Sequence, residues 1–230
     1  KYVCGTINTI LLIDANLPPY AMVNAIVTAT EAKTVAIQQL MAPSQYSDGI
    51  ATGSGTDMIA LVADRNSPRF LADAGKHSKL GEIIANCVIE ATQKALEQQS
   101  GLTPHSQCDM LIRLERFGIN EQYYWKMASE MEGEGSKEKF FASLRKMSRD
   151  PSLVGVTTSV LHIIDEIAWG LISEDAGKKA AFTTIKGMFF TWDASKQVTI
   201  SSLLLEEESI LENWIRVTAW LAKRGICCAP

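Results

Sequence analysis

Histidine and cysteine are scarce in this chain and are not spaced for metal binding. Its 230 residues include three histidines and five cysteines, and no two cysteines form a CxxC pair. Cys227 and Cys228 are adjacent, which is poor geometry for bridging to each other. Zinc sites need closely spaced Cys and His ligands, and disulfide scaffolds need paired cysteines. We therefore expect no resident metal, no disulfide framework and reduced cysteines.

Long apolar runs and an excess of one charge are also missing. No segment reaches the roughly 18 to 20 uninterrupted apolar residues that a membrane span requires. The 22 lysines and arginines nearly balance the 26 acidic residues, which leaves a net charge of −4 and no basic stripe. We therefore expect neither a membrane nor a nucleic acid as partner. No signal peptide is visible, so the expected location is cytoplasmic.

Two regions of different character follow one another along the chain. Residues 1–100 alternate between strand and helix patterns, whereas residues 101–230 carry mainly helical patterns and could form a subdomain of their own. In the first region, Ile7–Asp14 and Asp57–Ala63 are short apolar runs typical of buried strands. The pattern predicts an α/β or α+β fold, with layered strand-helix units in the N-terminal half and a mainly helical C-terminal half.

Two helices are expected between and after these strands. Pro18 and Pro19 can open the first, Tyr20–Met41, because proline fits the first helical turn. Its small and apolar residues recur at helical spacing, which suits close packing on a sheet. Ser78 is a good N-cap for the second helix, which continues to about Ala95.

Helical patterns dominate the second region. They cover Cys108–Phe117, Glu121–Glu130, Lys137–Met147, Leu153–Ile172 and Leu203–Lys223. Thr183–Thr199 is less clear, and short strands are the interpretation there. One expected helix face gathers His162, Asp165, Glu166 and Trp169. A His–carboxylate pair at this spacing can hold a metal, but a solvated helix face is the better interpretation.

The most informative segment is the loop that leads into the second strand, ATGSGTD at residues 51–57. Gly53 and Gly55 let the backbone take positive φ and approach a ligand closely. Asp57 adds a carboxylate, and hydroxyl groups come from Thr52, Ser54 and Thr56. The loop enters a strand and lacks GK[ST], so it is neither a Walker A loop nor a dinucleotide fingerprint. Its backbone N–H groups could cradle an anion, or it could be a plain tight turn.

Two further segments contain candidate acid–base or anion-binding residues. Asn24, Thr28 and Glu31 lie at i, i+4 and i+7 of the first helix, where a buried carboxylate could act as acid or base. The segment GKHSKLG, residues 75–81, begins the second helix, where free N–H groups favour anions. Its His77 can transfer protons near neutral pH. The alternative for the polar line on the first helix is a solvated helix face. The alternative for GKHSKLG is an ordinary capped helix N-terminus.

Four blocks, in this order, resemble the adenosylcobinamide amidohydrolase family of corrinoid salvage. They are GTINTILLIDANL, MVNAIVTATEAKTVAIQQL, ATGSGTD and GKHSKLGEIIA, spread over residues 5–85. The resemblance implies hydrolysis of the amide that joins the propionyl arm of the corrin ring to aminopropanol. The products are adenosylcobyric acid and 1-amino-2-propanol. The expected partner is thus a corrinoid that itself contains cobalt, and the enzyme needs no cofactor of its own.

Amide hydrolysis needs an activated nucleophile, a proton donor for the leaving amine and an oxyanion stabiliser. We predict Glu31 or Asp57 as the base for water and His77 as the proton carrier, with backbone N–H groups of residues 53–55 at the oxyanion. If Glu31 and Asp57 share one cleft, their pKa values should move apart and give one acceptor and one donor. Alternative nucleophiles are Thr30, Thr56 and, as a weaker candidate, Cys4.

Substrate contacts are expected from the matched blocks: Asn8, Thr28, Thr30, Lys33, Thr52, Gly53, Ser54, Gly55, Thr56, Lys76 and Ser78. Two other functions stay open. A corrinoid-binding module without catalysis would keep the same loops, and an unrelated amide hydrolase or transferase would act on a smaller substrate. The sequence also leaves open whether the chain forms a homo-oligomer.

Overall fold

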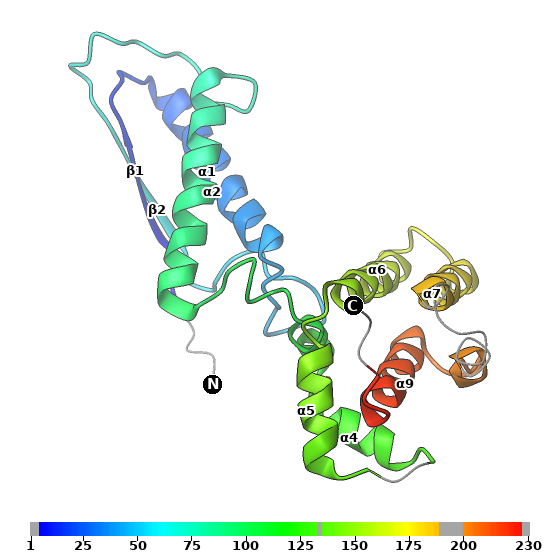
Figure 1. The fold of residues 1–230 in the computed structure, drawn as a ribbon. Helices are drawn as coiled ribbons and strands as arrows, with labels where there is room; N and C mark the ends of the chain where they lie inside the picture. The colour runs from blue at the N-terminus through cyan, green and yellow to red at the C-terminus, as the bar shows by residue number, and fades with distance from the viewer. Residues whose placement is uncertain (1–4, 133–134, 189–199, 227–230) are drawn as a thin grey trace. The chain divides into compact units, whose positions relative to one another are not determined.

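The computed structural model describes residues 5–132, 135–188 and 200–226. The chain forms two compact units, and the division falls between Gln107 and Cys108. The first unit contains both labelled strands, and the second is helical (Figure 1).

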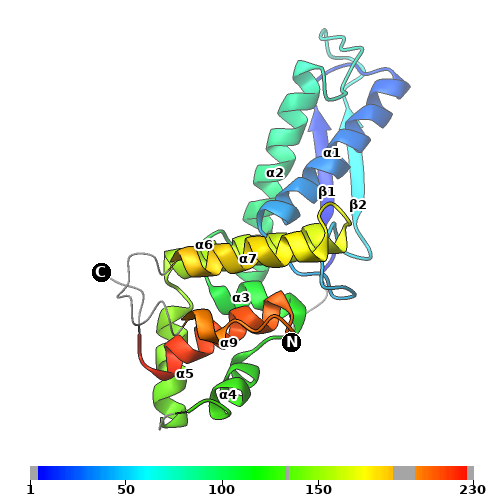
Figure 2. The same ribbon diagram turned by 90° about the vertical axis from the view of Figure 1, so that its right-hand side faces the viewer.

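The first unit follows the order strand, helix, strand, helix. β1 (Asn8–Ile13) and β2 (Met58–Ala63) pair in parallel. α1 (Pro19–Gln39) connects the two strands, as parallel neighbours require, and α2 (Lys79–Ser100) follows β2. Both helices lie on the same side of the strands (Figures 1 and 2). The predicted layered α/β arrangement of the N-terminal half is confirmed.

Alanine dominates the face of α1 that packs against the rest of this unit. Ala21, Ala25, Ala29 and Ala36 are completely buried, one or two helical turns apart. Such small side chains let α1 approach α2 and the sheet closely, as the sequence pattern predicts. Other members of this core are Leu11, Ile13, Leu17, Ile84 and Val88.

Capping residues define both ends of α2. The hydroxyl of Ser78 accepts a hydrogen bond from the N–H of Gly81 at 3.0 Å, which makes Ser78 the N-cap. Gly101 takes the left-handed C-cap conformation with φ of 68°. A side chain at Gly81 would clash with the carbonyl oxygen of Gly75, so this glycine lets the preceding loop fold tightly against the helix.

The second unit is mainly helical, as predicted. Its labelled α-helices are α3 (Met110–Leu114), α4 (Glu121–Ser129), α5 (Lys137–Met147), α6 (Pro151–Ala168), α7 (Glu174–Met188) and α9 (Ile210–Lys223). The core surrounds α9, whose Trp214 is completely buried and donates its indole N–H to the hydroxyl of Thr157 at 3.1 Å. Within the described ranges, every helix is too short or too polar to span a lipid bilayer.

The interpretation of Thr183–Thr199 as short strands is wrong for the part that the structure describes. Residues 183–188 belong to α7. The hydroxyls of Thr183 and Thr184 donate to carbonyl oxygens four residues earlier, at 2.8 and 2.9 Å, which lets these β-branched residues fit the helix. The rest of the segment, 189–199, lies outside the described residues.

Two helix ends in this unit also differ from the prediction. α9 begins at Ile210 rather than at residue 203, because Ser209 forms a reciprocal capping box with the glutamate three residues later. α6 ends at Ala168 rather than at residue 172, and Gly170 follows in the left-handed region with φ of 73°.

Candidate functional site

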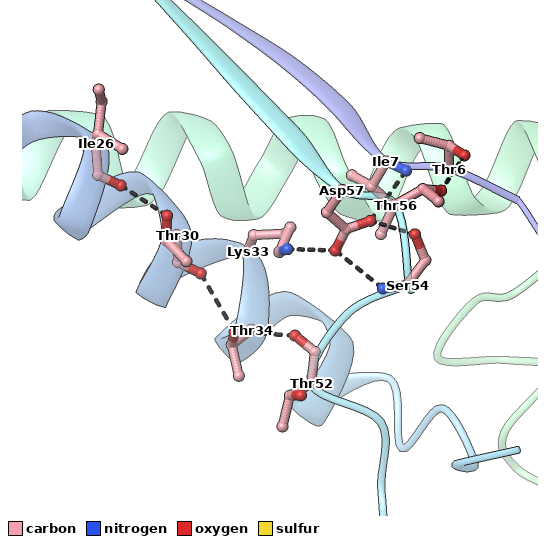
Figure 3. Close-up of polar contacts among 10 residues, drawn as sticks. All are labelled: Thr6, Ile7, Ile26, Thr30, Lys33, Thr34, Thr52, Ser54, Thr56 and Asp57. Carbon is pink, nitrogen blue, oxygen red and sulfur yellow. Dashed lines mark hydrogen bonds and ion pairs between the residues drawn. The ribbon is translucent and has the colours of Figure 1, made fainter. Parts of the chain in front are cut away.

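Asp57 stands where the loop enters β2 and is the centre of a group of polar contacts (Figure 3). Its carboxylate accepts hydrogen bonds from the ammonium of Lys33 and the hydroxyl of Ser54. It also accepts the backbone N–H groups of Ser54 at 2.9 Å and of Ile7 at 3.1 Å. These contacts tie the loop to α1 and to the start of β1. Lys33, Ser54 and Asp57 together are termed the Asp57 cluster.

The Asp57 cluster is largely shielded from water. The side chains of Lys33 and Asp57 are only 8% and 10% exposed. Burial raises the pKa of Asp57, but the hydrogen bonds from Lys33 and Ser54 outweigh burial, so this pKa lies below its ordinary value. The carboxyl is therefore ionised at neutral pH, where it can pair with a lysine.

Gly53 makes room for this ion pair. A Cβ at this position would lie 2.5 Å from Asp57 Oδ2 and 3.1 Å from Lys33 Nζ, whereas a Cβ at Gly55 would meet nothing within 4 Å. The prediction that these two glycines supply positive φ is wrong, because neither is among the described glycines with positive φ. The lack of a side chain at residue 53 serves the close approach of charged groups instead.

Further hydroxyl groups surround the loop. Thr34 of α1 donates to the carbonyl oxygen of Thr52 at 3.0 Å, and the hydroxyls of Thr6 and Thr56 lie 2.5 Å apart. The hydroxyl of Thr30 donates to a carbonyl one turn earlier in α1 at 2.8 Å. Thr30 and Thr56, the alternative nucleophiles, thus bond to a carbonyl and to another hydroxyl rather than to a base.

A second group of predicted site residues gathers where the loop before α2 meets α1. The ammonium of Lys76 lies 2.7 Å from Glu31 Oε1, and the buried hydroxyl of Thr28 donates to a carbonyl of the same loop at 3.1 Å. The side chains of Glu31 and Lys76 are 48% and 61% exposed. His77, next in the chain, is exposed. This group is therefore far more open to solvent than the Asp57 cluster.

Contacts among the described residues thus divide the predicted site in two. Asp57 bonds to Lys33 and Glu31 bonds to Lys76, and none of these contacts joins the two carboxylates. The expected facing pair of acids is replaced by two separate lysine–carboxylate pairs. Glu31 and Lys33 are about 200° apart around α1, so their side chains meet different segments of the chain.

Asn8 and Cys4 are the remaining predicted residues, and two further residues of α1 were not predicted. Asn8 is exposed on β1, and Cys4 lies outside the described residues. Thr34 and Gln38 of α1, which were not predicted, donate to loop carbonyl oxygens at 3.0 and 2.9 Å. Their spacing of four residues, continuing from Thr30, was the available signal for a polar helix edge beside the loop.

The described part of the chain holds no group of three or more His, Cys, Asp or Glu side chains suited to a metal ion. On α6, the carboxylate of Asp165 accepts two hydrogen bonds from Arg116, at 2.8 and 2.7 Å. His162 Nε2 lies 3.2 Å from a carboxylate oxygen of Glu166. The polar side chains of this helix face are therefore engaged in contacts within the second unit.

Comparison with known proteins places the matched region in the first unit. The model of the adenosylcobinamide amidohydrolase family matches residues 1–104, which confirms the resemblance over that range. An uncharacterized protein from Methanocaldococcus jannaschii is 43% identical over 96 residues, which are 41% of this chain and 37% of that protein. The chain thus spans little more than a third of this curated relative. No solved structure matches.

Proposed function

We propose that this protein hydrolyses the amide of adenosylcobinamide and releases 1-amino-2-propanol. The corrinoid is the proposed partner, and no cofactor of the protein's own is invoked. Support comes from the family match over residues 1–104, a range that contains both groups of site residues. A cytoplasmic location fits this activity, because salvaged corrinoids would re-enter synthesis there.

The Asp57 cluster is the observation that carries the proposal. Asp57 is shielded, ionised and already accepts a hydroxyl hydrogen bond, so we assign it the role of proton acceptor for the nucleophile, a role in which its lowered pKa makes it a weak base. The neighbouring ammonium of Lys33 supplies positive charge where an oxyanion develops. Asp57 and Lys33 therefore provide two of the three functions that amide hydrolysis requires.

The proposed reaction moves one proton in each step. Water attacks the amide carbon and passes a proton to Asp57 while the carbonyl oxygen becomes an oxyanion beside Lys33. The oxyanion then collapses, the C–N bond breaks, and the leaving nitrogen takes a proton that His77, in the separate solvent-exposed group, delivers through water. His77 and Asp57 exchange protons with solvent to complete the cycle. The exposed position of His77 suits this exchange.

Incubation of the purified chain with adenosylcobinamide tests the proposal. Mass spectrometry should detect 1-amino-2-propanol and adenosylcobyric acid in equal amounts. A shift in the corrinoid absorption spectrum without either product would replace the proposal with a binding module. The absence of both product and spectral shift would leave an amide hydrolase or transferase of a smaller substrate as the alternative.

Ser54→Ala distinguishes two forms of the mechanism. We propose water as the nucleophile, with Ser54 positioning Asp57 through its hydroxyl and backbone N–H. The variant keeps the backbone bond, so turnover should fall by about tenfold, the scale of one hydrogen bond. A loss of turnover of about 10⁴-fold or more would instead make Ser54 the nucleophile.

A further inference from the structure

The loop that carries Ser54 and Asp57 is held by side chains rather than by its own backbone. Residues 52–57, all of which the structure describes, form no hydrogen bond between two backbone groups. They belong to no helix and to no strand. A segment without backbone pairing opens easily, so the position of this loop depends on the side chains that bind it.

Two side chains of α1 bind the first part of the loop. The hydroxyl of Thr34 donates to the carbonyl oxygen of Thr52 at 3.0 Å (Figure 3). One helical turn further along α1, the amide of Gln38 donates to the carbonyl oxygen of Ala51 at 2.9 Å. Residues four positions apart lie on the same side of a helix, so the two donors reach the carbonyls of two consecutive loop residues. Thr34 and Gln38 together are termed the α1 clamp.

The hydroxyl of Thr34 is shared between the loop and its own helix. It also lies 3.2 Å from the carbonyl oxygen of Thr30, but its contact with Thr52 is shorter. Threonines in helices can donate to the carbonyl four residues earlier, as Thr30 does at 2.8 Å. A hydroxyl has a single hydrogen, so the loop draws Thr34 away from a bond that its own helix could accept in full.

The clamped segment leads directly to the Asp57 cluster. Ser54 follows Thr52 by two residues, and both its backbone N–H and its hydroxyl donate to the carboxylate of Asp57. Gly53 stands between them, where a Cβ would lie 2.5 Å from Asp57 Oδ2. The segment therefore has little room to shift toward the carboxylate. Movement of the clamped carbonyls away from α1 would carry Ser54 with them and loosen its two bonds to Asp57.

We propose that Thr34 and Gln38 are positioning residues, which act through the loop to hold Asp57 in the orientation that amide hydrolysis requires. This inference rests on the proposed function. The hydrogen bonds to the carboxylate come from Lys33, Ser54 and Ile7, so the α1 clamp acts on it indirectly. Misplacement of a reacting group by about 1 Å can lower turnover by about 10²-fold. The clamp should therefore affect kcat more than KM.

The double variant Thr34→Val/Gln38→Met tests the proposal, because each change removes a donor and nearly keeps the shape of the side chain. Thr52 is exposed, so water can bind its freed carbonyl and the variant should fold. With adenosylcobinamide as substrate, kcat should fall by about 10–10²-fold, whereas KM should change by less than about threefold. Thr34→Ser keeps the hydroxyl and should turn over at nearly the original rate.

Thr183→Val is the matched control. Thr183 is an exposed threonine of α7 in the second unit, and its hydroxyl donates to a carbonyl of its own helix at 2.8 Å. The control thus makes the same chemical change on a helix without touching the loop. Its kcat and KM should equal those of the original chain.

Titration of the Asp57 carboxyl by 13C NMR tests the clamp without substrate. The two bonds from Ser54 help to lower the pKa of Asp57, so release of the loop should raise this pKa. The expected rise in the double variant is about 0.4–1, the scale of one hydrogen bond. Lys33, the charged group bonded to Asp57, is kept in every variant. The pKa of Asp57 should be unchanged in Thr183→Val.

The two measurements separate the α1 clamp from the proposed function. No amine release by the original chain, together with a raised pKa of Asp57 in the double variant, would overturn the proposed function and still support the hold of the clamp on Asp57. An unchanged pKa in the double variant would overturn the clamp. An active original chain whose kcat is matched by the double variant, or a loss of kcat that is as large in Thr34→Ser, would also overturn it.

Discussion

Replacement of Asp57 by asparagine should strongly destabilise the first unit. Asp57 accepts four hydrogen bonds, two on each carboxylate oxygen. Asparagine has one acceptor oxygen, so its NH2 group would face two donors and the buried ammonium of Lys33 would lose its counter-charge. Removal of one partner from a buried ion pair costs about 3–5 kcal/mol. The free energy of unfolding should therefore fall by about 3 kcal/mol or more.

Thermal and urea unfolding followed by circular dichroism provide the measurement. For a domain of about 100 residues, 3 kcal/mol corresponds to a decrease in Tm of roughly 12 °C or more. Glu31→Gln is the matched control, because it removes a carboxylate from an exposed pair with Lys76. Exposed pairs contribute at most about 1 kcal/mol. Equal destabilisation by the two variants would refute the argument that burial makes the Asp57 cluster important.

Three further predictions concern the same unit. Gly53→Ala should lower the free energy of unfolding by about 1–3 kcal/mol in chemical unfolding, because its Cβ would crowd the ion pair. Gly55→Ala should leave this free energy nearly unchanged. Similar values for the two variants would contradict the argument that residue 53 must lack a side chain. The folded pKa of Asp57 lies below its unfolded value, so its stabilisation is complete above about pH 4 and is lost as pH falls through the folded pKa. The urea stabilities of the original chain and Asp57→Asn should therefore converge in acid, and a constant difference would contradict the assigned charge. His77→Ala should lower amine release by about 10²–10⁴-fold with Tm unchanged, and full activity would exclude His77 from the reaction.

The elements of the first unit could be predicted because their signals are local. Consecutive prolines mark the start of α1, Ser78 marks the start of α2, and short apolar runs mark the two strands. Each signal depends on residues that are neighbours in the chain. The close packing of α1 could be predicted likewise, because the helical spacing of its alanines identifies the buried side of the helix.

The ion pair of Lys33 and Asp57 could not be predicted in the same way. The two residues are 24 positions apart and meet only because α1 crosses back to the start of β2. Lys33 was expected to contact substrate, and Glu31 was expected near Asp57. The path of the chain, rather than residue type, decides which charged side chain reaches the loop.

Two errors had signals in the sequence that were misinterpreted. Ser209 and Glu212 have the spacing of a capping box, which locates the start of α9 correctly. Gly53 was interpreted through backbone freedom, but its role is steric, since a methyl group would meet two charged side chains. A glycine can be needed for space as well as for φ, and sequence alone does not distinguish these needs.

Release of 1-amino-2-propanol from adenosylcobinamide, with the original chain and Asp57→Asn compared at a temperature where both are folded, tests the central claim most directly. The account predicts amine release by the original chain and a rate at least about 10²-fold lower for the variant, the scale of a lost general base. No amine release by the original chain, or equal rates for the two proteins, would contradict it.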